Sequence, residues 1–425
     1  MIRNRPFDAD GRPFPTTFWL TCPEAVRAVS RLESEGWIAR LGERAAEDDS
    51  FARALDTAHR AYALERGRDA PNAEAFGGIG GTRRGIKCLH AHYAYHLAGG
   101  DDPVGAWVAG HVEPIHPDDR PRVGVVDLGT NSIRLLVARP TSDAGLEELA
   151  RDMVITRIGE DVDATGAIDD AALARTLDVL GRYARRTRAL RAGGPVVSAT
   201  SAVRDASNRD ALERAVLDLT RIPLRVIDGD HEARLSFSGA TRGLDLPAPF
   251  LVVDVGGGST ELAFGAGRPE ATTSVRIGSV RLTERFVRSD PPSADEVRAI
   301  RHEARARLAE AGARVPIAGA RTFVAVSGTA TTVQGVALDL EAWDPEATHR
   351  TWLSIDDAEA VLARLASMTS EQRAAFPVMP PGREDVITAG AAILVEAMRL
   401  ARFDRALVSE TDILDGLALE ALGAR

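Results

Sequence analysis

The strongest constraint on the fold is a motif that occurs twice: an apolar strand, an aspartate, a glycine turn and a second apolar strand. The first copy covers residues 123–137, VGVVDLGTNSIRLLV, and the second covers residues 250–264, FLVVDVGGGSTELAF. Glycine adopts backbone dihedrals closed to other residues, so the amide N–H groups of such a turn can converge on an anion. A single glycine turn is often an ordinary hairpin, but the repetition predicts a duplicated lobe.

Composition excludes several classes of protein. The 425 residues and 44% hydrophobic content allow two or three domains with substantial cores. No apolar run approaches the length needed to cross a bilayer, and the polar N-terminus lacks the apolar region of a signal peptide. Two cysteines, Cys22 and Cys88, cannot build a disulfide framework. We therefore expect a cytoplasmic protein with no membrane partner.

The charge balance limits how an anionic ligand can be held. A net charge of -10 argues against a broad nucleic-acid-binding surface, which needs clustered cations. Lys87 is the only lysine in the sequence, which excludes a phosphate-binding loop of the GxxxxGK[ST] type. Arginine, backbone N–H groups or a metal ion must therefore meet the charge of any phosphate.

The chain divides into segments of different pattern. Residues 1–110 are mainly helical, and the segment 111–122, HVEPIHPDDRPR, has the prolines and charges of a linker. From residue 123 onward strands alternate with helices, which predicts an α/β fold. We expect lobe I over residues 123–248 and lobe II over residues 249–425, with the C-terminal helix packing back on lobe I.

Seven motifs make this part of the chain similar to a known family. They occur in the order seen in the exopolyphosphatase and guanosine pentaphosphate phosphohydrolase family, and the resemblance covers residues 123–425. It implies two ribonuclease H-like lobes of the actin, Hsp70 and sugar kinase superfamily, with a cleft between them. The motifs are VVDLGTNSIRLLV, VSATSAVRDASN, VIDGDHEARLSFSGA, VVDVGGGSTELAFG, SVRIGSVRLTERF, VSGTATTVQGVAL and REDVITAGAAILVEA.

Glu232 is the candidate general base. Hydrolysis of a terminal phosphoryl group needs a positioned water and a base that takes its proton. Glu232 follows a strand and the turn at Gly229, from which its carboxylate could reach a cleft. A solvated acid stabilised by a helix dipole is the alternative. The frame DGDHEAR, residues 228–234, favours catalysis, and Glu232 matches the family's catalytic glutamate.

Asp127 and Asp254 are the candidate metal ligands. Both stand at the ends of strands that face the predicted cleft, where carboxylates would repel phosphate without a cation. We assign them to Mg²⁺, bound directly or through water. Mn²⁺ is the alternative ion, and K⁺ is a further candidate.

Several residues are candidates for holding phosphate. Arg204 can pair with two phosphate oxygens through its planar guanidinium, although most arginines lie on the surface. Gly328 and Thr329 could touch substrate or only cap the following helix. An arginine-rich helical run could guide polyphosphate, although a solvated face is the more common role of such a run; it comprises Arg182, Arg185, Arg186, Arg188 and Arg191. The two turns contribute Gly129, Thr130, Asn131, Ser132, Gly256, Gly257, Gly258 and Ser259.

These features and the resemblance together predict a metal-dependent phosphoanhydride hydrolase that releases orthophosphate from the end of inorganic polyphosphate. Guanosine pentaphosphate is the rival substrate, and the sequence does not separate the two. A sensor that binds (p)ppGpp or ATP without turnover is an alternative from another class. A phosphotransferase is disfavoured because no sugar-recognition segment is evident. A homodimer is compatible with the resemblance.

The N-terminal segment is similar to a second family, domain of unknown function 501. The resemblance is carried by PFPTTFWLTCP and GTRRGIKCLHAHYAYHLAGGDDPVG. Members of that family begin further upstream and have additional cysteines, which is consistent with a truncated start. If residues 86–97 are helical, Cys88, His92 and His96 share one face and could bind zinc with Cys22. Burial of these side chains in a helical core is the favoured alternative.

Overall fold

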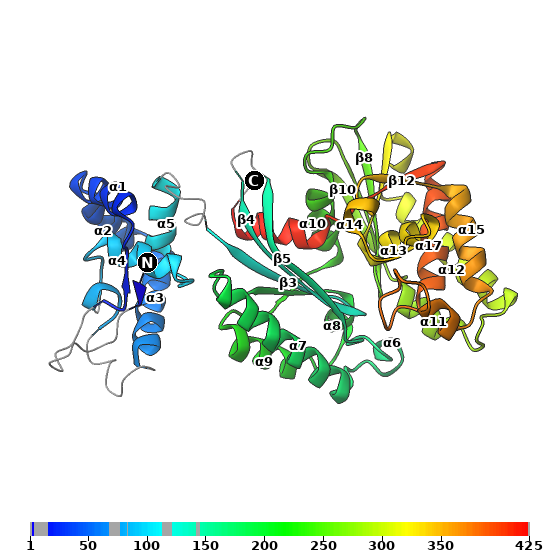
Figure 1. Cartoon of the computed structure of the whole chain (residues 1–425), viewed down its shortest axis with the longest axis horizontal. Helices are drawn as coiled ribbons and strands as arrows, with labels where there is room; N and C mark the ends of the chain where they lie inside the picture. The colour runs from blue at the N-terminus through cyan, green and yellow to red at the C-terminus, as the bar shows by residue number, and fades with distance from the viewer. Residues whose placement is uncertain are drawn as a thin grey trace. The chain divides into compact units, whose positions relative to one another are not determined.

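The computed structural model describes residues 2–3, 16–67, 77–82, 84–112, 121–141 and 145–423. The chain divides into two compact units (Figure 1): the first comprises residues 1–123 and 186–194, and the second comprises residues 124–185 and 195–425. Most of the predicted linker, residues 113–120, lies outside the described residues, and His111 belongs to the helix that precedes it.

The first unit is mainly helical, as predicted. Val29, Leu55, Leu89 and Val108 come from four different helices and pack into one core, since each helix places its apolar residues on one face. A short antiparallel pair of strands joins residues 2–3 to residues 18–19. The elements are β1 Ile2–Arg3, β2 Phe18–Trp19, α1 Pro23–Ser34, α2 Trp37–Glu47, α3 Asp49–Gly67, α4 Leu89–Leu97 and α5 Pro103–His111.

The second unit contains two sheets, and their topology confirms the predicted duplication. The first sheet has the order β5-β4-β3-β6-β7, and the second has the order β10-β9-β8-β11-β13-β12. In each, the strand that carries the aspartate lies between its hairpin partner and a parallel strand. The first sheet consists of β3 Val123–Leu128, β4 Ser132–Pro140, β5 Leu146–Ile155, β6 Val196–Ala199 and β7 Arg225–Val226.

The second sheet is larger because it has one additional antiparallel strand, β12, at its edge. It consists of β8 Phe250–Val255, β9 Thr260–Gly265, β10 Pro269–Val275, β11 Thr322–Val326, β12 Thr351–Ser354 and β13 Arg405–Val408. The helices that accompany the first sheet are α6 Val162–Thr165, α7 Asp170–Ala189, α8 Ser201–Asp205 and α9 Asp210–Thr220.

Helices cover both faces of the second sheet (Figure 1). Successive side chains of a strand point to opposite faces, so Leu251 and Val253 pack in one core while Phe250 and Val252 pack in another. Because both faces are buried, β8 is apolar at almost every position. The helices are α10 Gly229–Thr241, α11 Ser279–Phe286, α12 Ala294–Gly312, α13 Ser327–Ala337, α14 Pro345–Thr348, α15 Ile355–Ala366, α16 Ser370–Ala374, α17 Ile387–Ala401 and α18 Ile413–Ala421.

Two helices link the two sheets. Helix α10 packs its residues Ala233, Phe237 and Ala240 on the second sheet, although it precedes residue 248 in the sequence. Helix α18 packs against α10 and against β4 of the first sheet. The pair of helices α10 and α18 therefore contacts both sheets and connects the two lobes. The lobe boundary at residue 248 stays a prediction.

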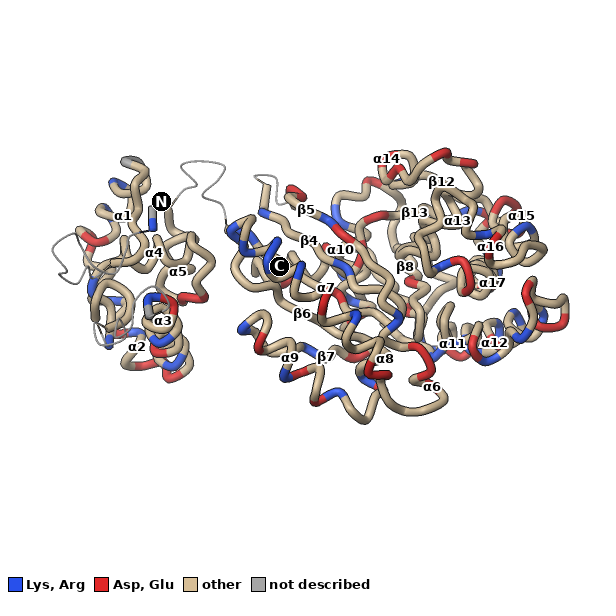
Figure 2. Tube along the Cα trace, turned by 60° about the horizontal axis from the view of Figure 1, so that its bottom comes forward, with Lys and Arg blue, Asp and Glu red and all other residues tan. Residues whose placement is uncertain are grey.

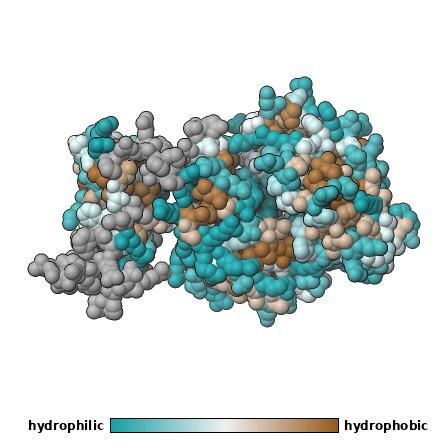
Figure 3. All heavy atoms as spheres, viewed as in Figure 1, coloured by the Kyte–Doolittle hydropathy of each residue, from teal (hydrophilic) through white to brown (hydrophobic). Residues whose placement is uncertain are grey.

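The surface carries mixed charge. Acidic and basic residues are interspersed along the second unit in Figure 2, and apolar side chains on the face shown in Figure 3 form separate patches among hydrophilic ones.

The predicted arginine-rich run lies at the end of α7 and just beyond it, where all five arginines are exposed and none lines the cleft described below. Among the described helices, we find none that is both long and apolar enough to cross a membrane.

Candidate active site

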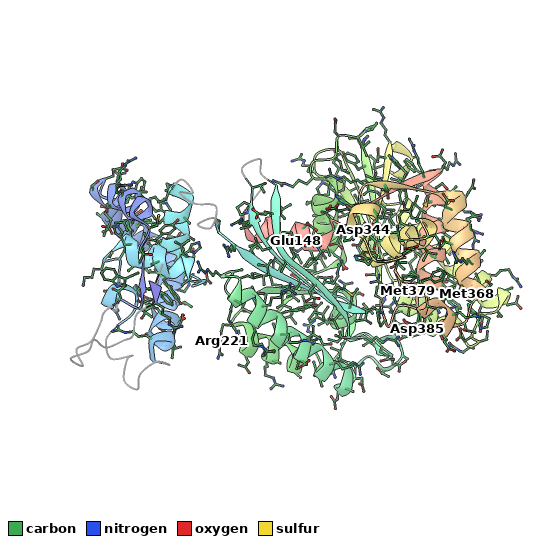
Figure 4. All side chains as sticks on the ribbon, viewed as in Figure 1. Glu148, Arg221, Asp344, Met368, Met379 and Asp385 are labelled. Carbon is green, nitrogen blue, oxygen red and sulfur yellow. The ribbon has the colours of Figure 1, made fainter. Side chains whose placement is uncertain are left out.

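A cleft of about 850 Å³ lies within the second unit, where the ends of β3 and β8 meet. Glu148 on β5 and Met379, both labelled in Figure 4, belong to its lining. Of the residues predicted for catalysis, Mg²⁺ binding and substrate binding, all but Arg204 line this cleft. They are Asp127, Gly129, Thr130, Asn131, Ser132, Glu232, Asp254, Gly256, Gly257, Gly258, Ser259, Gly328 and Thr329.

The two turns of the repeated motif have the same local geometry. The amide of Gly129 donates to the carbonyl of Ser132 at 3.0 Å, and the amide of Gly256 donates to the carbonyl of Ser259 at 3.0 Å. The turns also approach each other, since a Cβ on Gly258 would lie 2.7 Å from Thr130 Oγ1, and it would lie 2.3 Å from Ser201 Oγ. A side chain at position 258 would therefore require the Ser201 and Thr130 side chains to move.

Glu232 lies in the first turn of α10, and its side chain is almost completely buried. Asp228 caps the start of the helix, because its carboxylate accepts from the amide of His231. Glu232 Oε2 has no hydrogen-bond partner among the described residues, although Arg204 Nη1 is 3.8 Å away. Burial raises the pKa of Glu232 well above its usual value, and the nearby Glu261 raises it further.

Arg204 is the one predicted substrate-binding residue that does not line the cleft, and its contact with phosphate stays a prediction. Its Nη1 atom donates to the carbonyl of Ile227 at 2.9 Å and faces Glu232 at 3.8 Å. This hydrogen bond fixes the guanidinium to the backbone that leads into α10, close to the Glu232 carboxylate. In this position Arg204 lowers the pKa of Glu232, against the stronger effect of burial.

Carboxylates other than Glu232 are also buried here: Asp127 and Asp254 line the cleft, and Glu261 lies opposite Asp254 in the sheet. Asp254 accepts from Ser236 Oγ at 2.7 Å, and Glu261, its cross-strand partner on β9, accepts from Ser274 Oγ at 2.7 Å. Burial is the main cause that raises the pKa of Asp254 to about 6 and of Glu261 to about 8. Burial also raises the pKa of Asp127, against the effect of Arg134. Bringing these groups together therefore favours a bound cation or proton.

Arg134 and Asp412 were not identified from the sequence. Arg134 donates to Asp127 Oδ2 through Nε at 3.1 Å and Nη2 at 2.7 Å, and through Nη1 it pairs with Asp412. Asp412 caps α18 by accepting from the amide of Leu414. Although burial opposes the charged form, Asp412 and Asp127 raise the pKa of Arg134. Arg134 lies within one of the seven family motifs, whereas no local pattern marks Asp412.

The other wall of the cleft begins at the N-terminus of α13. Thr329 donates its hydroxyl to the carbonyl of Val255 at 2.9 Å, which fixes α13 to the end of β8. Arg383 donates to Gly328 O and to Thr332 Oγ1, both at 2.8 Å. Burial lowers the pKa of Arg383 to about 10, so it remains a cation at neutral pH. It is a second arginine of the cleft that the sequence did not single out.

The predicted zinc ligands of the first unit are not brought together. Helix α4 begins at Leu89, so Cys88 has an extended backbone and does not share the helical face of His92 and His96. His92 is fully buried and its Nδ1 lies 2.8 Å from Asp102 Oδ2, while burial lowers the pKa of His96. Both histidines therefore belong to the helical core, which was the favoured alternative. Cys22 and Cys88 are free thiols.

Two sheets of equivalent topology, with two aspartate and glycine turns at one cleft, define a two-lobed α/β protein that can hold an anionic ligand. Residues 136–424 match the Ppx/GppA phosphatase family. This chain belongs to that family. Members of the family generally depend on a divalent metal ion. Residues 1–110 match a second family, described as a protein of unknown function (DUF501).

Similar proteins cover nearly all of the second unit. Exopolyphosphatase 2 of Mycobacterium tuberculosis is 43% identical over 315 residues, which are 71% of this chain and 99% of that protein. The crystal structure of an exopolyphosphatase-like protein is 36% identical with a TM-score of 0.68, and the match covers 71% of this chain and 99% of the other. The Aquifex aeolicus family member is 28% identical with a TM-score of 0.61, over 71% and 98% of the two chains.

Proposed function

We propose that this cleft hydrolyses the terminal phosphoanhydride bond of inorganic polyphosphate. The observation that carries the proposal is the buried carboxylate of Glu232, which lies in the same cleft as the two glycine turns. The similarity to a mycobacterial protein named exopolyphosphatase supports polyphosphate as the substrate. In the reaction a water oxygen bonds to the terminal phosphorus, the bridging P–O bond breaks, and orthophosphate and a polyphosphate shorter by one unit are formed.

Glu232 acts as the general base in this proposal. It accepts a proton from the attacking water as the new P–O bond forms, and it must be deprotonated to do so. Burial and neighbouring carboxylates raise its pKa, which makes it a stronger base than an exposed glutamate. Arg204, at 3.8 Å, orients the carboxylate and favours its ionised form.

Mg²⁺ is the ion that we propose for the cleft, with Mn²⁺ as the alternative. Asp127 Oδ1 is buried and has no hydrogen-bond partner among the described residues, while Oδ2 of the same group is held by Arg134. A buried carboxylate oxygen in this situation is a suitable ligand for a hard divalent cation, and Asp254 offers a second. The ion supplies positive charge that offsets the phosphate oxygens.

The two turns bind the terminal phosphate in this proposal. Residues 129–132 and 256–259 line the cleft from both lobes. The amides of Gly129 and Gly256 close their own turns, so the donors that we propose are backbone N–H groups further along each turn. Arg383 lies against Gly328 on the far wall and can neutralise phosphates further along the chain. These donors replace the lysine that a conventional phosphate-binding loop would use.

Release of orthophosphate from several substrates tests the proposal. The full chain is treated with chelator, supplied again with Mg²⁺, and assayed with polyphosphates of several lengths, guanosine pentaphosphate and ATP side by side. We expect kcat/KM for at least one polyphosphate to exceed that for guanosine pentaphosphate by at least about tenfold, a difference of about 1.4 kcal/mol in transition-state binding. A preference for guanosine pentaphosphate would contradict the proposal that polyphosphate is the substrate. Binding of these ligands without any turnover would identify a sensor.

A further inference from the structure

Three side chains with metal-binding atoms converge in the first unit, away from the helical core histidines. They are Glu33 near the end of α1, Cys88 immediately before α4, and His90 in the first turn of α4, and we call them the Glu33–Cys88–His90 group. Their ligand atoms all lie within 4.8 Å of one another. His90 Nδ1 is 3.2 Å from Glu33 Oε1 and 3.9 Å from Cys88 Sγ.

The orientation of the His90 ring leaves the correct atom available for a metal. Its Nε2 atom lies 3.1 Å from the carbonyl oxygen of Val26, which can only accept a hydrogen bond, and 3.2 Å from Ser30 Oγ, which can accept as well as donate. The carbonyl therefore favours the neutral ring that carries its proton on Nε2. The lone pair of the neutral ring is then on Nδ1, which faces Glu33 and Cys88. Histidines that bind metals usually donate their other N–H to a carbonyl or carboxylate in this way.

The Glu33 carboxylate is also held in position. Its Oε1 atom accepts from the amide of Leu89 at 2.7 Å, which ties the end of α1 to the start of α4. The side chains of Glu33 and His90 are 26% and 22% exposed, so an ion can reach them from solvent. The group is therefore ordered by contacts outside itself and still accessible.

We propose that the Glu33–Cys88–His90 group binds a zinc-class transition metal ion. A thiolate, an imidazole and a carboxylate together suit Zn²⁺ and not Mg²⁺, which prefers oxygen ligands alone. From ordinary bond lengths, a tetrahedral zinc ion separates its sulfur and nitrogen ligands by roughly 3.6 Å and its nitrogen and oxygen ligands by roughly 3.4 Å. The observed separations of 3.9 and 3.2 Å are close to these values.

An ion pair is the competing explanation for the same geometry. Without a metal, the hydrogen bond to Cys88 is the largest influence that raises the pKa of His90, to about 9, and Glu33 adds to it. A protonated ring would satisfy both neighbours and leave no site for an ion. Metal binding by the full chain distinguishes the two explanations.

Cobalt(II) is the probe for this test, because a Co²⁺ ion bound to a thiolate gives an intense near-ultraviolet charge-transfer band. Carboxylates of the cleft in the second unit can bind Co²⁺ but cannot produce that band. We expect the reduced, chelator-treated full chain to give the band with one Co²⁺ per chain, and added Zn²⁺ to abolish it. We expect Cys88→Ser to remove the band, while Glu33→Gln and His90→Gln weaken Co²⁺ binding at least about tenfold.

Cys22→Ser is the matched control, because Cys22 is the other free thiol of the same unit and does not belong to the group. It should keep the band and the Co²⁺ affinity of the unmodified chain. Circular dichroism establishes that each variant is folded before it is compared. The proposal is overturned if the unmodified chain gives no band, if Cys88→Ser keeps it, or if Glu33→Gln and His90→Gln bind Co²⁺ like the unmodified chain.

Discussion

Arg134 is the residue on which the charge balance of the cleft most depends. It pairs with Asp127 and with Asp412, and these carboxylates come from parts of the chain that are far apart in sequence. Both acids are buried, so either would be costly to ionise without a cation beside it. Burial raises the pKa of Asp127, and the guanidinium of Arg134 opposes that shift.

Replacing Arg134 by methionine should destabilise the protein more at high pH than at low pH. Asp127 and Asp412 would lose the cation that they share, and breaking a buried pair in this way costs about 3–5 kcal/mol. Burial already raises the pKa of Asp127, and without Arg134 this acid can take up a proton at lower pH, so the loss should shrink. Thermal unfolding of Arg134→Met at two pH values measures the effect. An equal loss of Tm at both would contradict the assigned role.

Arg209→Met is the control for this prediction. Arg209 pairs with Glu213 at 3.3 Å on the surface of the same unit, and both side chains are well exposed. A surface pair of this kind contributes about 0–1 kcal/mol. Its loss should change Tm little at either pH.

At the scale of elements, the approach of α10 to α18 positions two parts of the cleft. The helices cross where Gly239 and Gly416 have no side chain: a Cβ on Gly416 would overlap the carbonyl oxygen of Leu235, and one on Gly239 would overlap that of Asp412. Glu232 lies near the start of α10, and Asp412 caps α18. A shift between these helices would therefore move the proposed base relative to the partner of Arg134.

We expect Gly416→Ala to lower both stability and activity. The added methyl group meets backbone that cannot move aside, so the cost should reach the upper part of the usual range for overpacking, about 1–3 kcal/mol. Tm and the rate of phosphate release measure the two effects. A variant with unchanged Tm would show that the helices do not cross this closely.

Gly181→Ala in α7 is the corresponding control. A Cβ there would meet only ordinary contacts, with Arg185 and Leu219 at 3.7 and 3.9 Å. Alanine in a helix is favoured over glycine by roughly 0.5–1 kcal/mol, so this variant should be slightly more stable and equally active.

The sequence predicted some elements and residues well because the information was local. The repeated motif predicted a duplicated lobe, and together with the family resemblance it predicted that Asp127, Asp254 and the two turns share one cleft. Strand β5, LEELARDMVI, was not predicted, because its leucine, glutamate, alanine and arginine residues favour helix and only pairing with β4 makes it a strand. The zinc prediction depended on residue 88 being helical, and α4 begins one residue later.

Contacts between distant segments could not be predicted. Glu261 lies within one of the seven family motifs, but its raised pKa depends on burial and on its position opposite Asp254 in the sheet. The pair of Arg134 with Asp412 depends on where α18 returns in the fold. A strand residue can face either side of a sheet, so the motif alone did not tell which side chains would meet.

At the scale of the whole molecule, the buried acids should make stability depend on pH and metal together. Burial raises the pKa of Asp254 to about 6 and that of Glu261 to about 8, above their values in the unfolded chain. Each carboxyl group therefore stabilises the folded chain when the pH is below its pKa in the unfolded chain. This stabilisation is lost as the pH rises through its pKa in the folded chain. A cation bound by these carboxylates would oppose that loss.

The Tm of chelator-treated protein should accordingly fall as the pH is raised from about 5 to about 8. Added Mg²⁺ should raise the Tm more at about pH 8 than at about pH 5. Glu261→Gln should weaken the loss in the upper part of this interval, because it removes the carboxyl group whose pKa is raised to about 8. Differential scanning calorimetry with and without Mg²⁺ provides the comparison. A Tm that rises with pH in chelator would contradict the assignment of these pKa values.

The central claim is that Glu232 takes the proton of the water that attacks polyphosphate. The most direct test is the steady-state rate of orthophosphate release by Glu232→Gln and by the unmodified chain with polyphosphate and Mg²⁺. Loss of a general base predicts a fall in kcat of at least about a hundredfold, with KM within about threefold because the substrate-binding turns are intact. A variant that keeps kcat within about tenfold of the unmodified chain would show that Glu232 is not the base.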